Sequence, residues 1–118
     1  MAAWGKVAIL ETRGRITGKP TRAAVGFLEE PDGSLLVAAG SPDADWALNL
    51  EAGPRCRAEI GERRLTLDAV TLEGADRSAA IVGLILRYGT PAERLGGGPA
   101  FRLVPVDDQD EPVTRIGS

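Results

Sequence analysis

Short apolar runs separated by polar turns recur through the first part of the chain. The runs at residues 6–12, 21–29 and 35–39 have the length and β-branched content of strands. Residues 30–34 read Glu-Pro-Asp-Gly-Ser, in which proline presets φ and Asp-Gly supplies a tight reversal. The pattern therefore predicts a three-stranded meander with the polar loop after Thr12 at one end.

Three further strands are predicted downstream. Residues 56–60 and 64–68 alternate apolar and polar side chains, which is typical of strands with one buried face, and the second can continue to Leu72. Residues 101–106 form a last apolar run. The side chains that we expect to be mostly buried are Val7, Ile9, Leu36, Ile60, Leu65, Leu67, Leu84 and Leu103.

Two helices are expected, at residues 42–52 and 75–88. Ser41 is a candidate N-cap for the first, with Pro42 at its first helical position. In the second, the apolar positions of residues 79–86 extend around more than one narrow stripe. Such a helix is buried on several sides or lies in a subunit contact, so we expect a homodimer.

These elements predict a β-rich α+β fold, a six-stranded antiparallel barrel with the two helices packed at its openings. Residues 1–106 are expected to form a single domain and residues 107–118 a polar C-terminal tail. The strict βαβ alternation of a Rossmann fold does not occur.

Composition excludes several classes of function. The net charge of −3 argues against a general nucleic-acid binder. The chain has no histidine, which removes the usual metal ligand and general base, so we expect no metal site. Cys56 is the one cysteine and fits a reducing compartment, and residues 1–4 do not have the pattern expected of a signal peptide. The run 79–86 is too short for membrane insertion, so a cytoplasmic protein is predicted.

A basic stretch at residues 12–22, TRGRITGKPTR, carries the candidate chemistry. It holds four cationic side chains, and no acid occurs between Thr12 and Leu28, although acids outnumber bases in the whole chain. Gly14 and Gly18 allow backbone turns with φ > 0 that bring N–H groups close to a ligand. The stretch predicts a site for an anionic ligand, and the alternative is a solvated hairpin turn with ordinary surface arginines.

Two motifs resemble those of the deazaflavin-dependent nitroreductase family. Residues 12–20, TRGRITGKP, are similar to its TTGRKTGKPR loop, and residues 46–54, WALNLEAGP, resemble its W-x-x-N-L-x-A-x-P helix. The resemblance implies a split β-barrel of the flavin-reductase, FMN-binding type. It also implies transfer of hydride from reduced coenzyme F420 to a small-molecule acceptor, namely a quinone, a nitro compound or an activated alkene.

The same resemblance implies which residues form the site. The coenzyme carries a phosphodiester and a polyglutamate tail, which cationic and hydroxyl side chains can bind. The residues expected to bind it are Gly14, Arg15, Thr17, Gly18, Lys19, Ser41, Trp46 and Asn49. For Trp46 the alternative is core packing. Asn49 can contact ring carbonyls or pin the loop, and the alternative for it is capping or bracing the loop at residues 40–45. Tyr88 is a candidate proton donor or pocket residue, or it closes its helix against the core.

Departures from the family pattern keep other functions open. Ile16 stands where the family has a lysine, and the family's later arginine falls one place on, at Arg22. A shift of one residue in a strand reverses the face, so the sequence leaves open whether Arg22 reaches the site. The aromatic substrate pocket is reduced to Tyr88 and little else. The alternatives are a non-catalytic protein that binds a deazaflavin, a flavin or a lipid-like ligand, and an FMN-dependent oxidase of the same superfamily.

Overall fold

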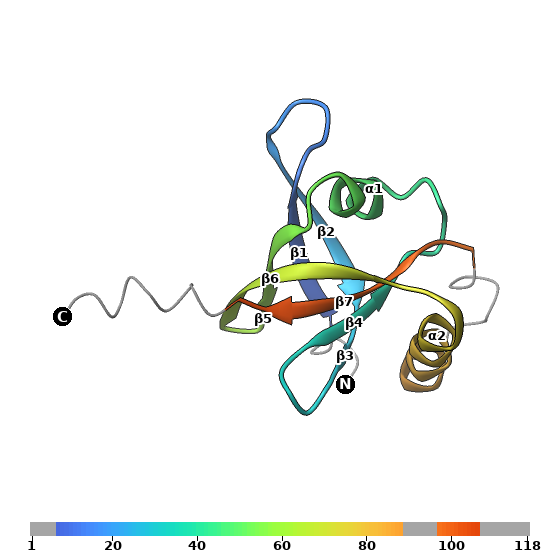
Figure 1. Ribbon diagram of the computed structural model, residues 1–118. Coiled ribbons are helices and arrows are strands. Elements are labelled where there is room, and N and C mark those ends of the chain that lie inside the picture. Colours follow the sequence, from blue (N-terminus) through green and yellow to red (C-terminus); the bar gives the residue numbers. More distant parts are fainter. Residues whose placement is uncertain (1–6, 89–96, 107–118) are drawn as a thin grey trace.

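The computed structural model describes residues 7–88 and 97–106, which form one curled sheet and two helices (Figure 1). The strands are β1 (Val7–Arg13), β2 (Pro20–Gly26), β3 (Leu28–Glu29), β4 (Leu35–Ala38), β5 (Arg55–Ile60), β6 (Arg63–Leu72) and β7 (Ala100–Pro105). The helices are α1 (Asp45–Ala52) and α2 (Gly74–Tyr88). The sheet order is β2-β1-β5-β6-β7-β4-β3, and every neighbouring pair is antiparallel. The predicted tail, residues 107–118, lies outside the described residues.

The sheet has seven strands rather than the six predicted, because the expected strand at 21–29 is divided at Phe27. β2 pairs with β1, whereas β3 pairs with β4 at the other end of the sheet order. At the break, the Phe27 N–H donates to the Tyr88 hydroxyl at 3.0 Å, and that hydroxyl donates to the Phe27 carbonyl at 3.1 Å. A side chain from α2 thus satisfies the backbone where strand pairing is interrupted.

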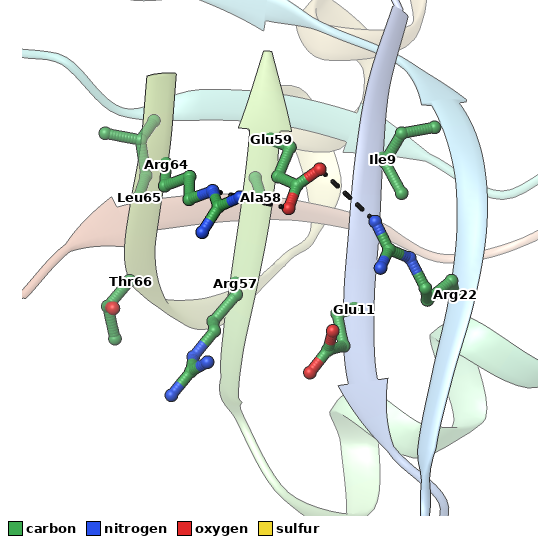
Figure 2. A pocket seen from close by; sticks show the side chains of 9 residues that line it. All are labelled: Ile9, Glu11, Arg22, Arg57, Ala58, Glu59, Arg64, Leu65 and Thr66. Atoms are coloured by element: carbon green, nitrogen blue, oxygen red, sulfur yellow. Dashed lines mark hydrogen bonds and ion pairs between the residues drawn. The ribbon is translucent and has the colours of Figure 1, made fainter. Parts of the chain in front are cut away.

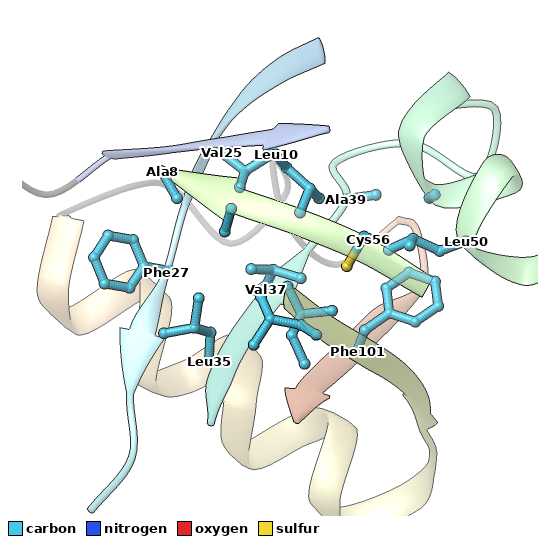
Figure 3. Packing of buried hydrophobic residues seen from close by; sticks show 14 residues of the cluster. Ala8, Leu10, Val25, Phe27, Leu35, Val37, Ala39, Leu50, Cys56 and Phe101 are labelled. Carbon is cyan, nitrogen blue, oxygen red and sulfur yellow. The ribbon is translucent and has the colours of Figure 1, made fainter. Parts of the chain in front are cut away.

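The main core lies inside the curl of the sheet (Figure 3). On β1 the buried side chains are Ala8, Leu10 and Thr12. The predicted burial of Val7 is therefore wrong, because Val7 is exposed, and Ile9 is only half-buried. The first four residues of β1 are all apolar, and such a run has no alternation from which to choose the inner face.

Other core predictions have mixed outcomes. Leu36 is half-buried beneath α2, while its neighbours Leu35 and Val37 face the main core. Ile60 and Leu65 are also half-buried and pack against the edge of the main core. The predicted burial of Leu67, Leu84 and Leu103 is confirmed.

Helix α1 closes one end of the core. It begins at Asp45 instead of Pro42, and Ala44 occupies the N-cap without a side-chain hydrogen bond. The prediction of Ser41 as N-cap is therefore wrong, because its hydroxyl accepts the Asp43 N–H at 3.1 Å in a turn before the helix. Within the helix, Leu50 is buried in the main core.

Helix α2 packs on the outer surface of β4 and β7. Ala80 contacts a small cluster with Leu72 and Ala100, on the side of the sheet opposite to the main core. One stripe of α2 is therefore buried within the chain. Val82 and Leu86 lie off that stripe and are 54% and 79% exposed.

Candidate functional site

The loop between β1 and β2, residues 14–19, is closed by its own hydrogen bonds. The Gly14 N–H donates to the Lys19 carbonyl and the Gly18 N–H to the Gly14 carbonyl, both at 2.8 Å. Gly18 has φ +78°, a conformation that glycine adopts without strain. The Lys19 N–H donates to the Thr17 hydroxyl at 3.2 Å. The glycines therefore shape the loop, and their own N–H groups are already used.

Two other backbone N–H groups, at the tip of this loop, are available to a ligand. Among the described residues, the N–H groups of Ile16 and Thr17 have no hydrogen-bond acceptor. Ile16 itself is 84% exposed. Adjacent N–H groups next to a residue with positive φ are the arrangement that backbone anion sites use.

Asn49 connects this loop to α1. Its side-chain oxygen accepts the Arg15 N–H at 3.1 Å and Arg15 Nη1 at 2.8 Å. Its amide nitrogen donates to the Thr12 hydroxyl at 3.0 Å. Both Asn49 and Thr12 are buried. Of the alternatives that the sequence left open, the observed contacts are those of a residue that pins the basic loop.

Arg15 lies across the gap between the loop and the first turn of α1. Its Nη2 atom is 3.4 Å from Asp45 Oδ1, and its Nη1 atom is 3.5 Å from the Asp45 carbonyl oxygen. The Arg15 side chain is 29% exposed and that of Asp45 is 77% exposed. The guanidinium is therefore positioned by α1 while part of it remains accessible to a ligand.

A groove of about 450 Å³ runs between the loop and the C-terminal end of α1. Its lining residues are Arg13, Gly14, Arg15, Ile16, Thr17, Gly18, Asn49, Ala52 and Gly53. Five of the eight residues expected to bind the cofactor thus share one groove. Lys19 lies on the same loop without lining it.

The remaining predicted residues lie elsewhere. Ser41 is in the turn before α1. Trp46 packs against the main core with its ring centroid 6.0 Å from that of Phe101, at 58°. Tyr88 lies on α2, at the opposite end of the molecule from the basic loop (Figure 1). Arg22 pairs with Glu59 at 3.2 Å on the outer face of the sheet, so it does not reach this groove.

Besides Arg13 and Ile16 of the basic stretch, four residues at the site were not predicted: Ala52 and Gly53 line the groove, whereas Thr12 and Asp45 contact Asn49 and Arg15. Thr12 gave no signal, because the predicted burial of Val7 and Ile9 would place its side chain on the outward face of β1. The other three lie on α1 or just after it, and they approach the loop only because α1 packs against β1 and β2. The spacing of residues along the sequence does not reveal that contact.

Comparison with known protein families identifies the family of this chain. The family described as F420H(2)-dependent quinone reductase matches residues 2–88. The chain belongs to this family. As a member it is an oxidoreductase whose coenzyme is F420, so the predicted family, enzyme class and cofactor are confirmed.

Solved structures agree with this family at the level of the fold. The structure described as F420-H2 dependent reductase (FDR-A) has a TM-score of 0.72 at 23% identity, covering 83% of this chain and 93% of that one. HutZ, the heme storage protein from Vibrio cholerae, gives 0.68 at 22%, covering 86% and 82%. A structure described as a domain-swapped dimer gives 0.71 at 24%, covering 83% and 79%. The predicted split β-barrel class is thereby confirmed.

Proposed function

We propose that this member of the F420-dependent reductase family transfers hydride to a quinone, and that the groove beside the basic loop holds the anionic part of the coenzyme. Nitro compounds and activated alkenes are further acceptors of the same electrophilic character. The observation that carries the proposal is the Asn49 contact, which fixes Arg15 and two donor N–H groups at one groove. The bound coenzyme supplies the hydride.

The residues of the groove fit a phosphate or carboxylate. Arg15 offers part of a planar guanidinium, and Lys19 adds a second cation on the same loop. The Thr17 hydroxyl accepts the Lys19 N–H and keeps its own proton for a ligand oxygen. The N–H groups of Ile16 and Thr17 add neutral donors. Trp46, turned into the core, is not among the groove's lining residues.

The test is a fluorescence titration of F420 at low salt against two loop variants. Each lost charge-assisted contact is worth about 1.5–3 kcal/mol, so Arg15→Ala and Lys19→Ala should each weaken binding by roughly tenfold to a hundredfold. Arg63→Ala is the matched control, because Arg63 lies at the far end of β5 and β6 and pairs with Glu29 at 3.2 Å. Equal affinity of wild type and Arg15→Ala would remove the loop from the coenzyme site.

Folding measurements separate the two loop variants. Arg15→Ala removes contacts to Asp45 and Asn49, so it should lower the free energy of unfolding by up to about 1 kcal/mol. Lys19→Ala removes a side chain without a described partner and should leave stability unchanged. A binding defect in Lys19→Ala therefore reports on the ligand alone.

We also propose that the protein forms a homodimer and is located in the cytoplasm. A homodimer is supported by the exposed apolar side chains of α2 and by the similarity to a protein described as a domain-swapped dimer. A cytoplasmic location is supported by the free thiol of Cys56. No helix in the described part of the chain is long and apolar enough to cross a membrane.

A further inference from the structure

The Arg15 guanidinium has two partners of different character. Asn49 is 3% exposed, and its side-chain oxygen accepts Arg15 Nη1 at 2.8 Å. The amide of Asn49 is itself fixed, because its nitrogen donates to the buried Thr12 hydroxyl at 3.0 Å. Asp45 contacts the other guanidinium nitrogen, Nη2, at 3.4 Å through a side chain that is 77% exposed. One end of the guanidinium is therefore held by a buried group, and the other end by a group in solvent.

The Arg15–Asp45 ion pair is unlike the other ion pairs among the described residues. Of the six, it combines the least exposed arginine side chain, at 29%, with the most exposed carboxylate, since the other carboxylates are 26–44% exposed. Glu59, for comparison, lies between Arg22 and Arg64 on the outer face of the sheet, at 3.2 Å and 3.6 Å (Figure 2). Asp45 is therefore the carboxylate that a competing anion displaces most easily.

Asp45 lies next to the groove but does not line it. A hollow of about 180 Å³ adjoins the groove and shares Arg15 and Asn49 with it. Asp45 and Thr21 line this hollow only. Arg15 is thus accessible from the groove, which no carboxylate lines, and from the hollow, which Asp45 lines. An oxyanion in the groove and the Asp45 carboxylate have the same guanidinium within reach.

We propose that Asp45 is an internal competitor of the anionic ligand, which lowers the affinity of the groove by pairing with Arg15. The inference rests on the proposed function, in which Arg15 binds the anionic part of the coenzyme. An exposed ion pair is weak because water solvates both charges, whereas a ligand phosphate can bind a guanidinium bidentately. The ligand therefore replaces Asp45 at Nη2, while Asn49 keeps Nη1 in place.

Asp45 also has a structural role, which predicts the opposite effect on binding. It is the acidic residue in the first turn of α1, where negative charge is favourable beside the helix N-terminus. The same helix carries Asn49, which holds the basic loop. A purely structural Asp45 would therefore support the groove, and its neutralisation would weaken ligand binding. Competition and structural support thus differ in the sign of one measurable effect.

Fluorescence titration of F420 with the full-length Asp45→Asn variant, in about 0.1 M salt, measures that sign. The affinity should rise by about two- to fivefold relative to wild type, which is the range that an exposed ion pair supports. The ratio of the two affinities should approach one in about 1 M salt, where the Debye length is about 3 Å. An unchanged or lowered affinity in about 0.1 M salt would overturn the competition.

Asp43→Asn is the matched control. It removes the same charge two residues earlier in the chain, from an exposed side chain that forms none of the ion pairs of the described residues. Its F420 affinity should stay within about 1.5-fold of wild type, because the charge acts only through solvent. An equal rise in Asp43→Asn and Asp45→Asn would reflect net charge alone and would also overturn the competition.

A double-mutant cycle identifies the group through which Asp45 acts. In the Arg15→Ala background, Asp45→Asn should change F420 affinity by no more than Asp43→Asn does, because the shared guanidinium is gone. A full two- to fivefold rise in that background would mean that Asp45 repels the ligand directly, and it would overturn the proposed competition for Arg15.

The same titrations recognise failure of the proposed function separately. Equal F420 affinity of wild type and Arg15→Ala removes Arg15 from the coenzyme site, whatever the effect of Asp45→Asn. Weakened binding by Arg15→Ala, together with no gain in Asp45→Asn, keeps Arg15 in the site and overturns the competition alone.

Discussion

At the scale of single residues, the Tyr88 hydroxyl acts as both donor and acceptor at one break in the sheet. It satisfies the N–H and the carbonyl of Phe27, which belong to neither β2 nor β3. The ring also lies close to Gly26, where an added Cβ would be 3.1 Å from a Tyr88 ring carbon and would require the ring to shift. The tyrosine of α2 and the glycine before the break are thus explained by one contact.

The variant Tyr88→Phe separates this structural role from proton donation. Loss of the hydroxyl leaves the Phe27 backbone unsatisfied and should lower the free energy of unfolding by about 1–2 kcal/mol, measured by urea denaturation. The turnover number with F420 should be unchanged. A large fall in turnover with a shifted pH profile, at unchanged coenzyme affinity, would instead identify Tyr88 as the proton donor.

Cys56 gives a pH-dependent prediction. Burial, and secondarily the charge of Asp68, raises the pKa of its thiol from 9.0 to about 12. Between these values the unfolded chain loses the proton and the native chain keeps it, so stability should fall as pH rises from 9 towards 12.

The measurement compares urea unfolding of wild type and Cys56→Ala between pH 8 and 11. The stability difference between them should narrow by at most about 1.4 kcal/mol per pH unit above the unfolded pKa. Titration of other groups cancels in this difference. A difference that does not change with pH would show that the thiol ionises equally in both states.

At the scale of elements, the positions of strands and helices along the chain were easier to predict than which face of each is buried and which elements it contacts. The alternation in β6 identified the inward side of Leu67, whereas the unbroken apolar start of β1 could not distinguish Val7 from Ala8. The glycine and arginine spacing located the basic loop. The junction of that loop with α1 depends on packing, so Asn49 could be named but its partners could not.

Two glycines test how closely the connections between elements are packed. A Cβ on Gly98 would lie 2.6 Å from the backbone oxygens of Ala39 and Ser41, so Gly98→Ala must displace main chain. We expect it to lower the free energy of unfolding by about 1–3 kcal/mol. Gly53→Ala is the control, because its site is open and its φ of −151° suits any residue. Equal unfolding temperatures of Gly98→Ala and Gly53→Ala would contradict this close packing.

At the scale of the whole molecule, the two helices serve opposite ends of the sheet (Figure 1). α1 closes the core and holds the basic loop through Asn49 and Asp45, so the charged groove depends on a short helix. α2 holds the break between β2 and β3 and presents Val82 and Leu86 to the outside. This separation allows the α2 end to form a subunit contact without covering the groove.

The homodimer can therefore be tested without disturbing the site. Wild type should show a light-scattering mass of two chains of 12.4 kDa at micromolar concentration. The double variant Val82→Lys, Leu86→Lys should shift it to one chain, because charges at a covered apolar face cost association energy. Its fold should persist, since both side chains are exposed within the chain. Ile16→Lys changes another exposed apolar side chain, at the opposite end of the molecule, and should stay dimeric. A wild-type mass of one chain would contradict the dimer, and a double variant that remains dimeric would place the contact away from α2.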